Sequence, residues 1–304
     1  MFIPHNPLLR SNGYELDCCP EAFGYLKDSS DLLSYPDELR FRMHEDGYLY
    51  LRGLLNSQDV WQVRQELATR LAVEGCLEPN FPILDCIAKP GLRMNFRPNL
   101  VAQSPTLQQL LYTGRLIEFF KVFLEGNVRH FDYTWLRAVA PGRGTHVHCD
   151  SVYMGRGTDK VYTVWTPLGD ISWHLGGLMI LENSHRLETI KNRYGQMDVD
   201  SYCANKRTAA LYASGKKYWS GALSKNPVSL RSRYGSRWLS TEFKAGDVLI
   251  FSMFTIHASL DNHSSAIRLS TDSRYQLASE PVDERWVGSN PIGHSLAGRR
   301  SRIC

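Results

Sequence analysis

Short β-type runs fill the chain between residues 127 and 280, and no helical pattern alternates with them. Each run is rich in β-branched and aromatic residues and is bounded by Gly, Pro, Asn, Asp or Ser, which is typical of strands joined by turns. Parallel strands need helical crossovers, so this pattern argues against βαβ units and favours an antiparallel barrel or jelly roll. The runs are HFDYTWLRAV, KVYTVWTPL, GGLMILEN, DVLIFSMF and AIRLSTDSRYQ.

The first 126 residues read as mostly helical support for this β region. Pro36 near a first turn and Gly47 predict the start and end of one helix, and GYLYLRG then alternates like a short strand. Asn56 is placed to cap a second helix that ends near Gly75. The apolar face of that helix is predicted to carry Val60, Val63, Leu67 and Leu71. Two further helices are predicted from Ser104-Pro105 to Leu111 and from Arg115 to Leu124.

We therefore predict one domain over residues 1–304, with a helical part at 1–126, a β core at 127–280 and a tail at 281–304. One long polar stretch, residues 186–242, interrupts the β core. A connection of this length in a compact domain is usually functional, so we interpret it as an insertion that serves as a lid. A surface insertion without a role is the alternative.

Composition excludes several classes of protein. Apolar residues make up 43% and charged residues 22% of the 304, which is ordinary for a globular protein with a buried core. The formal charge of +4 gives no nucleic-acid footprint, and no run of 18 apolar residues predicts a membrane span. The seven cysteines form no CxxC pair, so we expect no disulfide framework, a reducing compartment and a cytoplasmic protein. The oligomeric state stays open.

A candidate metal site begins in the segment THVHCDSVY. On a strand, His148 and Asp150 would point to the same face and Cys149 to the other. An imidazole and a carboxylate can thus bind one metal, and a third ligand from elsewhere would complete a 2-His-1-carboxylate triad. A second HxD pattern, His44-Glu45-Asp46, falls at a predicted helix end where the two side chains diverge, so we interpret His44 as structural.

The segment GDVLIFSMFTIHASLDNHSSAIRLSTDSRYQ distinguishes between the two patterns. His257 follows an apolar strand, Ser259 would share its face, and Arg268 lies eleven residues further on. After the DNHSS turn, Arg268 would lie on the neighbouring strand near the metal. Its rigid set of donors suits a bidentate contact with the distal carboxylate of 2-oxoglutarate.

Together, HCD at 148–150, GGLMILENSH, AGDVLIF and the His257, Ser259 and Arg268 spacing resemble the phytanoyl-CoA dioxygenase family. MHEDGYLYLRGLLNSQDV resembles the family's opening helix and strand, and the resemblance extends from about residue 40 to residue 276. It implies a mainly β fold with flanking helices and a double-stranded β-helix core of the jelly-roll, cupin-like kind. It also implies that Fe(II) binds His148, Asp150 and His257, and that 2-oxoglutarate binds Arg268 with support from Ser259.

Trp165 falls at the family's tryptophan position, so the resemblance implies that it neighbours the co-substrate. Trp135 lies near another co-substrate position but does not align securely. Acyl-CoA chemistry is not carried over, because the 186–242 insertion departs from the pattern of CoA-using members.

Other polar residues have competing interpretations. His146 would complete a cupin-type HVH ligand pair, line the substrate pocket or simply pack, and Arg274 would pair with a surface acid rather than bind a carboxylate. The histidines outside these motifs are interpreted as structural or solvated. They are His130, His174, His185 and His263. A group in GLRMNFRPN is interpreted as structural, with binding of an anionic substrate as the alternative. It comprises Arg93, Asn95 and Arg97.

The expected reaction is oxidation of a small-molecule substrate, with hydroxylation first, O₂ consumed, and succinate and CO₂ as co-products. Asp150 argues against the related halogenases, which have a small residue at that position. Desaturation or ring formation in natural-product biosynthesis is the first alternative. A metal-binding family member without turnover and a cupin-like enzyme without 2-oxoglutarate are the others. The sequence does not identify the substrate.

Overall fold

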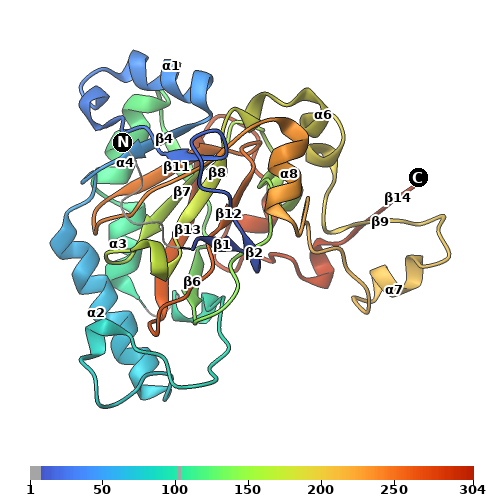
Figure 1. The fold of residues 1–304 in the computed structure, drawn as a ribbon. Helices are drawn as coiled ribbons and strands as arrows, with labels where there is room; N and C mark the ends of the chain where they lie inside the picture. Colours follow the sequence, from blue (N-terminus) through green and yellow to red (C-terminus); the bar gives the residue numbers. More distant parts are fainter. Residues whose placement is uncertain (1–7, 102–103) are drawn as a thin grey trace.

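Two facing β-sheets form the centre of the molecule (Figure 1), as described by a computed structural model for residues 8–101 and 104–304. Residues 1–7 of the predicted helical part, and residues 102–103, lie outside the described residues. The larger sheet has the order β4-β11-β7-β13-β5, with β6 also paired to β13, and all its neighbours are antiparallel. Its strands are β4 (Tyr48–Leu51), β5 (Val128–His130), β6 (Trp135–Val139), β7 (Tyr162–Pro167), β11 (Val248–Ser252) and β13 (Arg268–Leu277).

The smaller sheet has the order β12-β8-β10-β3 and faces the larger one. Its strands are β3 (Phe23–Tyr25), β8 (Leu178–Leu181), β10 (Trp238–Ser240) and β12 (His257–Ser259). Between the sheets, Trp165, Leu249 and Phe251 of the larger sheet pack with Ile180 and Leu239 of the smaller one in a single buried cluster. Alternating side chains of both sheets fill this interior. The predicted mainly β, jelly-roll fold is confirmed.

Four helices cover the outer face of the larger sheet (Figure 1). They are α1 (Pro36–Asp46), α2 (Ser57–Val73), α3 (Pro105–Tyr112) and α4 (Arg115–Phe123). Their predicted ends are confirmed: the Asn56 side chain accepts a hydrogen bond from the Gln58 N–H, and Gly47 ends α1 with φ 74°. A side chain at Gly47 would also meet the His185 ring, because a Cβ there would lie 2.3 Å from Nδ1.

Residues 186–242 do not form one irregular connection. They contain α6 (Glu188–Lys191), β9 (Ser201–Cys203), α7 (Ala209–Ala213) and α8 (Pro227–Tyr234). Their last part, β10, lies inside the smaller sheet, where it pairs with β8 and, in parallel, with β3. The strand is only three residues long, and its parallel partner comes from the other end of the chain, so no local pattern indicated it. The remaining short elements are β1 (Arg10–Ser11), β2 (Tyr14–Glu15), α5 (Ser151–Met154) and β14 (Arg300–Arg302).

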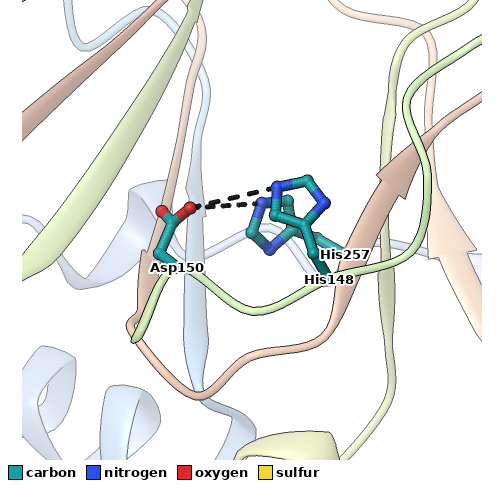
Figure 2. A group of neighbouring side chains, drawn as sticks. All are labelled: His148, Asp150 and His257. Atoms are coloured by element: carbon teal, nitrogen blue, oxygen red, sulfur yellow. Dashed lines mark ion pairs between the residues drawn. The ribbon is translucent and has the colours of Figure 1, made fainter. Parts of the chain in front are cut away.

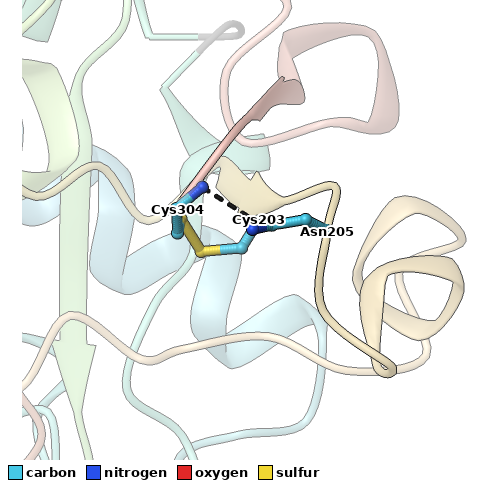
Figure 3. The surroundings of a disulfide bond; sticks show 3 residues. All are labelled: Cys203, Asn205 and Cys304. Carbon is cyan, nitrogen blue, oxygen red and sulfur yellow. Dashed lines mark hydrogen bonds between the residues drawn. A yellow bond between two sulfur atoms is a disulfide. The ribbon is translucent and has the colours of Figure 1, made fainter.

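The last 24 residues are not a free tail. Strand β14 pairs in parallel with β9, and a disulfide joins Cys203 to Cys304 beside them (Figure 3). The sequence analysis, which expected no disulfide framework, did not anticipate this single bond, because its two cysteines lie 101 residues apart and show no spacing signal. The Asn205 side chain also accepts a hydrogen bond from the Cys304 N–H. Among the described helices, none has the length and apolarity that crossing a bilayer requires.

Candidate active site

His148 and His257 are brought together by the backbone. Each donates its N–H to the other's carbonyl, at 3.0 and 2.9 Å, so the two residues form an antiparallel bridge between distant parts of the chain. Their rings lie 4.2 Å apart between centroids. Asp150 follows at the start of α5, and its Oδ1 lies 4.0 Å from Nε2 of His148 and 3.7 Å from Nε2 of His257 (Figure 2). Three potential ligand atoms therefore converge on one point.

Both histidines present the same nitrogen to that point. The Nδ1 of His148 bonds the His146 carbonyl at 2.7 Å, and the Nδ1 of His257 bonds the Thr255 carbonyl at 2.9 Å. A carbonyl accepts only, so Nδ1 carries the hydrogen and Nε2 keeps its lone pair. Burial, with the nearby His257, lowers the pKa of His148 to about 3, and burial likewise lowers the pKa of His257. The neutral imidazoles that metal binding requires are the stable forms here.

Asp150 is held from its other oxygen. Oδ2 accepts hydrogen bonds from the Thr163 hydroxyl and from Nη2 of Arg274 at 3.1 Å, which leaves Oδ1 facing the histidines. Burial opposes ionisation of this carboxyl, but the charge of Arg274, the two histidines and the Thr163 hydrogen bond outweigh it and lower its pKa. Asp150 is therefore a carboxylate, although only 2% of the residue is exposed.

The local structure differs from the predicted strand. His148 lies in an isolated bridge and Asp150 already has helical backbone angles, yet Cys149 still points away, with its thiol on the Phe254 carbonyl. Arg268 begins β13 of the larger sheet, whereas His257 begins β12 of the smaller one. The two residues thus belong to different sheets rather than to neighbouring strands. The turn between them crosses from one sheet to the other, which residue spacing alone does not reveal.

The interior near Arg268 has the properties of an anion site. Arg268 is 1% exposed; its Nη1 donates to the Gly176 carbonyl, but its Nε has no partner among the described residues. Burial and the nearby Arg137 lower the pKa of Arg268 to about 10, while Asp272 opposes them. The indole N–H of Trp165, the residue paired with Asp272 across β7 and β13, is also buried without a partner. Unpaired buried donors are costly, so these residues fit a bound anion such as 2-oxoglutarate.

Ser259 is fully buried on β12, two residues after His257. Its hydroxyl oxygen accepts a hydrogen bond from the Thr145 N–H at 2.8 Å and lies 3.2 Å from the Thr145 hydroxyl. It therefore ties the segment before His148 to β12. The expected common face of His257 and Ser259 is present, because alternate residues of a strand point the same way.

A cavity of about 340 Å³ opens beside His148 and Asp150. His146 lines it, as one interpretation of that residue expected, and so does Asn95, whereas Arg97 pairs with Glu74 and Arg93 is exposed. Several other lining residues could not be found from the sequence, because they come from separate elements and match no motif. They are Phe96, Arg137, Tyr153, Met154 and His294, and Trp135 lines the cavity as well.

Arg274 was interpreted wrongly as a partner of a surface acid. It is 2% exposed, bonds Asp150, and has its guanidinium carbon 4.0 Å above the centre of the Trp135 ring. By contrast, His44 is exposed at the end of α1 and lines a separate hollow of about 460 Å³. His174 and His263 are exposed as well. Among the described residues, the triad alone brings three such ligand atoms within 4.8 Å of one another.

A two-sheet jelly roll with a buried His-Asp-His group and a cationic interior defines a non-haem iron oxygenase of the 2-oxoglutarate-dependent class. The family model for phytanoyl-CoA dioxygenase matches residues 101–270, so the chain belongs to that family. It is an Fe(II)- and 2-oxoglutarate-dependent dioxygenase.

Among curated relatives, the chain is similar to 1-deoxypentalenic acid 11-beta-hydroxylase of Streptomyces arenae, with 23% identity over 85% of this chain and 87% of that protein. Among solved structures, it resembles the epimerase SnoN from nogalamycin biosynthesis, with 16% identity, a TM-score of 0.56 and coverage of 86% and 95%. The carbocyclase SnoK from the same biosynthesis gives 16% identity, a TM-score of 0.57 and coverage of 81% and 85%. These structures support the fold.

Proposed function

We propose that His148, Asp150 and His257 hold the Fe(II), and that Arg268, with Ser259 and Trp165, binds 2-oxoglutarate. The observation that carries the proposal is the convergence of two neutral Nε2 atoms and one carboxylate oxygen, each fixed by a hydrogen bond from its other side. Such supporting contacts orient metal ligands and set their protonation state. Arg268 adds a buried cation with a free N–H in the same interior.

We further propose that the cavity of about 340 Å³ takes a small organic substrate, which the enzyme hydroxylates. The volume lies in the ordinary range for small-molecule sites. The similar Streptomyces protein is a hydroxylase of 1-deoxypentalenic acid, whereas SnoK is a carbocyclase and SnoN an epimerase. Ring formation or desaturation is therefore the alternative outcome at the same site. The mass of the product separates these outcomes. Mass spectrometry would show the addition of one oxygen for hydroxylation and the loss of two hydrogens for ring formation or desaturation.

When bound, the iron and 2-oxoglutarate would supply the oxidising power that activates O₂ toward a C–H bond. The chain's own residues orient the metal ligands and the substrate and shield the site from water. Arg274 and Thr163 donate hydrogen bonds to Oδ2 of Asp150, so Oδ1 stays directed at the histidines. Trp135, covered by Arg274 on one face, forms a rigid wall of the substrate cavity. We expect the substrate to pack on Trp135, which would hold the reacting C–H bond in the correct position.

The test is anaerobic addition of Fe(II) and 2-oxoglutarate to the protein. A weak visible charge-transfer band is expected, and it should be lost in His148→Ala and need much more 2-oxoglutarate in Arg268→Ala. His263→Ala, at an exposed turn, is the matched control and should keep the band. An unchanged 2-oxoglutarate requirement in Arg268→Ala would refute the co-substrate assignment and favour a cupin-like enzyme. A band without succinate formation, with any of a broad metabolite panel, would favour a non-catalytic metal-binding protein.

We also propose that residues 186–242, apart from the core strand β10, act as a lid within a single domain. Limited proteolysis with and without substrate tests this, because equal cleavage rates would count against closure. We also propose a cytoplasmic location; because disulfides are rare in that compartment, it predicts that Cys203 and Cys304 are thiols in the cell and form the disulfide only on oxidation. Trapping of free thiols in freshly lysed cells, followed by mass spectrometry of the C-terminal peptide, decides between the two states.

A further inference from the structure

The C-terminal segment, residues 281–304, contributes His294 to one wall of the cavity. His148 and Asp150 line the same cavity. The family model ends its match at residue 270, so this wall belongs to a part of the chain outside the matched region. A side chain that lines the cavity from such a segment is a candidate for recognising this enzyme's own substrate.

The His294 ring is fixed in place. Its Nδ1 lies 2.8 Å from Oδ2 of Asp200, and the same oxygen accepts a hydrogen bond from Nη1 of Arg285 at 2.6 Å. Arg285 has a fully buried side chain. The ring edge also packs on Trp286, with centroids 4.7 Å apart, and on Tyr153, at 5.9 Å. These contacts with Asp200, Trp286 and Tyr153 fix the orientation of the ring, and with it the direction of the edge that does not face Asp200.

That free edge carries Nε2, which has no hydrogen-bond partner among the residues that the structure describes, and 36% of the side chain stays exposed. A carboxylate accepts only, so Nδ1 carries a hydrogen. In the neutral ring, a hydrogen on Nδ1 leaves Nε2 with a lone pair that can accept a hydrogen bond.

We propose that Nε2 of His294 accepts a hydrogen bond from a hydroxyl or amine N–H of the substrate and thereby determines specificity. The substrate class is a mainly apolar compound with one such donor, since Phe96, Trp135 and Met154 offer the cavity's apolar surface. The proposal rests on the proposed function, because it takes this cavity to be the substrate site. A site built to hydrogen-bond a substrate group rejects an analogue that lacks it.

The experiment compares two probes, 2-decalol and its methyl ether, which differ in the donor hydrogen. Binding is measured by calorimetry to protein loaded with Zn(II) and 2-oxoglutarate, so that no turnover occurs. The alcohol should bind wild-type protein about fivefold tighter than the ether, as expected for one hydrogen bond. His294→Asn, which can keep a donor toward Asp200 but lacks Nε2, should reduce this ratio to about one. His263→Asn is the matched control and should leave it unchanged.

If His294→Asn lowers the unfolding temperature, His294→Gln provides a second variant with an acceptor near the original Nε2, and it should keep part of the preference. Equal ratios in wild type and His294→Asn would overturn the proposal, and so would failure of both probes to bind wild type. The Fe(II) and 2-oxoglutarate charge-transfer band is recorded anaerobically on metal-free samples of the same purified proteins, loaded with Fe(II) in place of Zn(II). If wild type shows no band, the proposed function is refuted. If wild type shows a normal band but binds the alcohol no more tightly than the ether, only the role of His294 is refuted.

Discussion

Arg274 supports Asp150 from within the protein, so its effect on the metal site can be predicted. Arg274→Met removes the buried charge and the hydrogen bond to Oδ2 while keeping an unbranched side chain over Trp135. We expect metal affinity to fall about 10- to 100-fold, as for other contacts that orient a metal ligand. Anaerobic equilibrium dialysis with Co(II) measures it. The exposed Arg93→Met should bind as wild type does, and equal affinity in both variants would show that Arg274 does not support the site.

Trp165 offers a second residue-scale prediction. Its indole N–H is buried without a partner, and the ring packs on Phe243 at 4.7 Å. Trp165→Phe keeps most of the packing but removes the donor. We expect the Kd for 2-oxoglutarate to rise about tenfold, since a hydrogen bond to a charged group contributes about 1.5 kcal/mol or more. Titration of the charge-transfer band measures this, with Trp173→Phe as the control. An unchanged Kd would remove Trp165 from the co-substrate site.

Individual residues were predictable where a motif or a fixed spacing carried them. His148 and Asp150 were found by their spacing and His257 through the family resemblance, and the structure places the three together. Arg274 was misjudged because its partner, Asp150, lies 124 residues away, and no local pattern shows that a strand residue faces the interior. His294 escaped notice for the same reason, since its role depends on where the C-terminal segment docks.

At the scale of elements, caps and apolar periodicity located α1 to α4 and the long strands, because these signals are local, but not the short helices α5 to α8. The pairing of the strands was harder to predict from the sequence. For example, β12 and β13 follow one another in the chain but belong to different sheets. The pairs β10 with β3 and β14 with β9 join segments far apart in sequence. Short strands of three residues hold too little pattern to be recognised before their partners are known.

The arm formed by β9, α7 and β14 projects from the body (Figure 1), and the disulfide joins Cys203, the last residue of β9, to Cys304, two residues beyond β14. Cys304→Ser should lower the free energy of unfolding by about 2–4 kcal/mol, because the cross-link closes a long loop in the unfolded chain. It should also speed proteolysis within residues 204–218, while iron and 2-oxoglutarate binding stay unchanged. Denaturant unfolding and timed digestion measure the two effects. The control is Cys19→Ser, an exposed free cysteine, and digestion at the same rate in both variants would contradict the prediction.

At the scale of the whole molecule, the C-terminal segment closes the structure over the active site. Trp286 is 1% exposed and packs on Trp135, with ring centroids 4.7 Å apart. Beside it, Arg285 joins this segment to Asp198 and Asp200 of the 186–242 stretch. The two parts of the chain that the sequence analysis set apart as insertion and tail thus form one unit. Substrate access and global stability should therefore respond to the same contacts.

Arg285 allows that coupling to be tested through pH. Burial raises the pKa of Asp198, but Arg156 and Arg285 outweigh burial and hold it below its ordinary 3.8. The stability that comes from this carboxylate is thus fully present above about pH 4 and is lost as the pH falls through the lowered value. Arg285→Gln leaves Asp198, Asp200 and Asp283 short of one cation. We expect it to cost about 3–5 kcal/mol near pH 7, as for other broken buried ion pairs.

As the pH falls, the difference in unfolding free energy between wild type and Arg285→Gln should become smaller. Protonation then removes the carboxylate charges that Arg285 compensates in the wild type. Denaturant unfolding of both proteins between pH 3 and pH 7 measures the difference, with Arg300→Gln, from the exposed pair with Glu284, as the control. A deficit that stays constant over this range would mean that Arg285 acts through packing alone. A deficit that narrows, together with weaker binding of 2-decalol by the variant at pH 7, would mean that the same buried charges hold both the C-terminal segment and the cavity wall that carries His294.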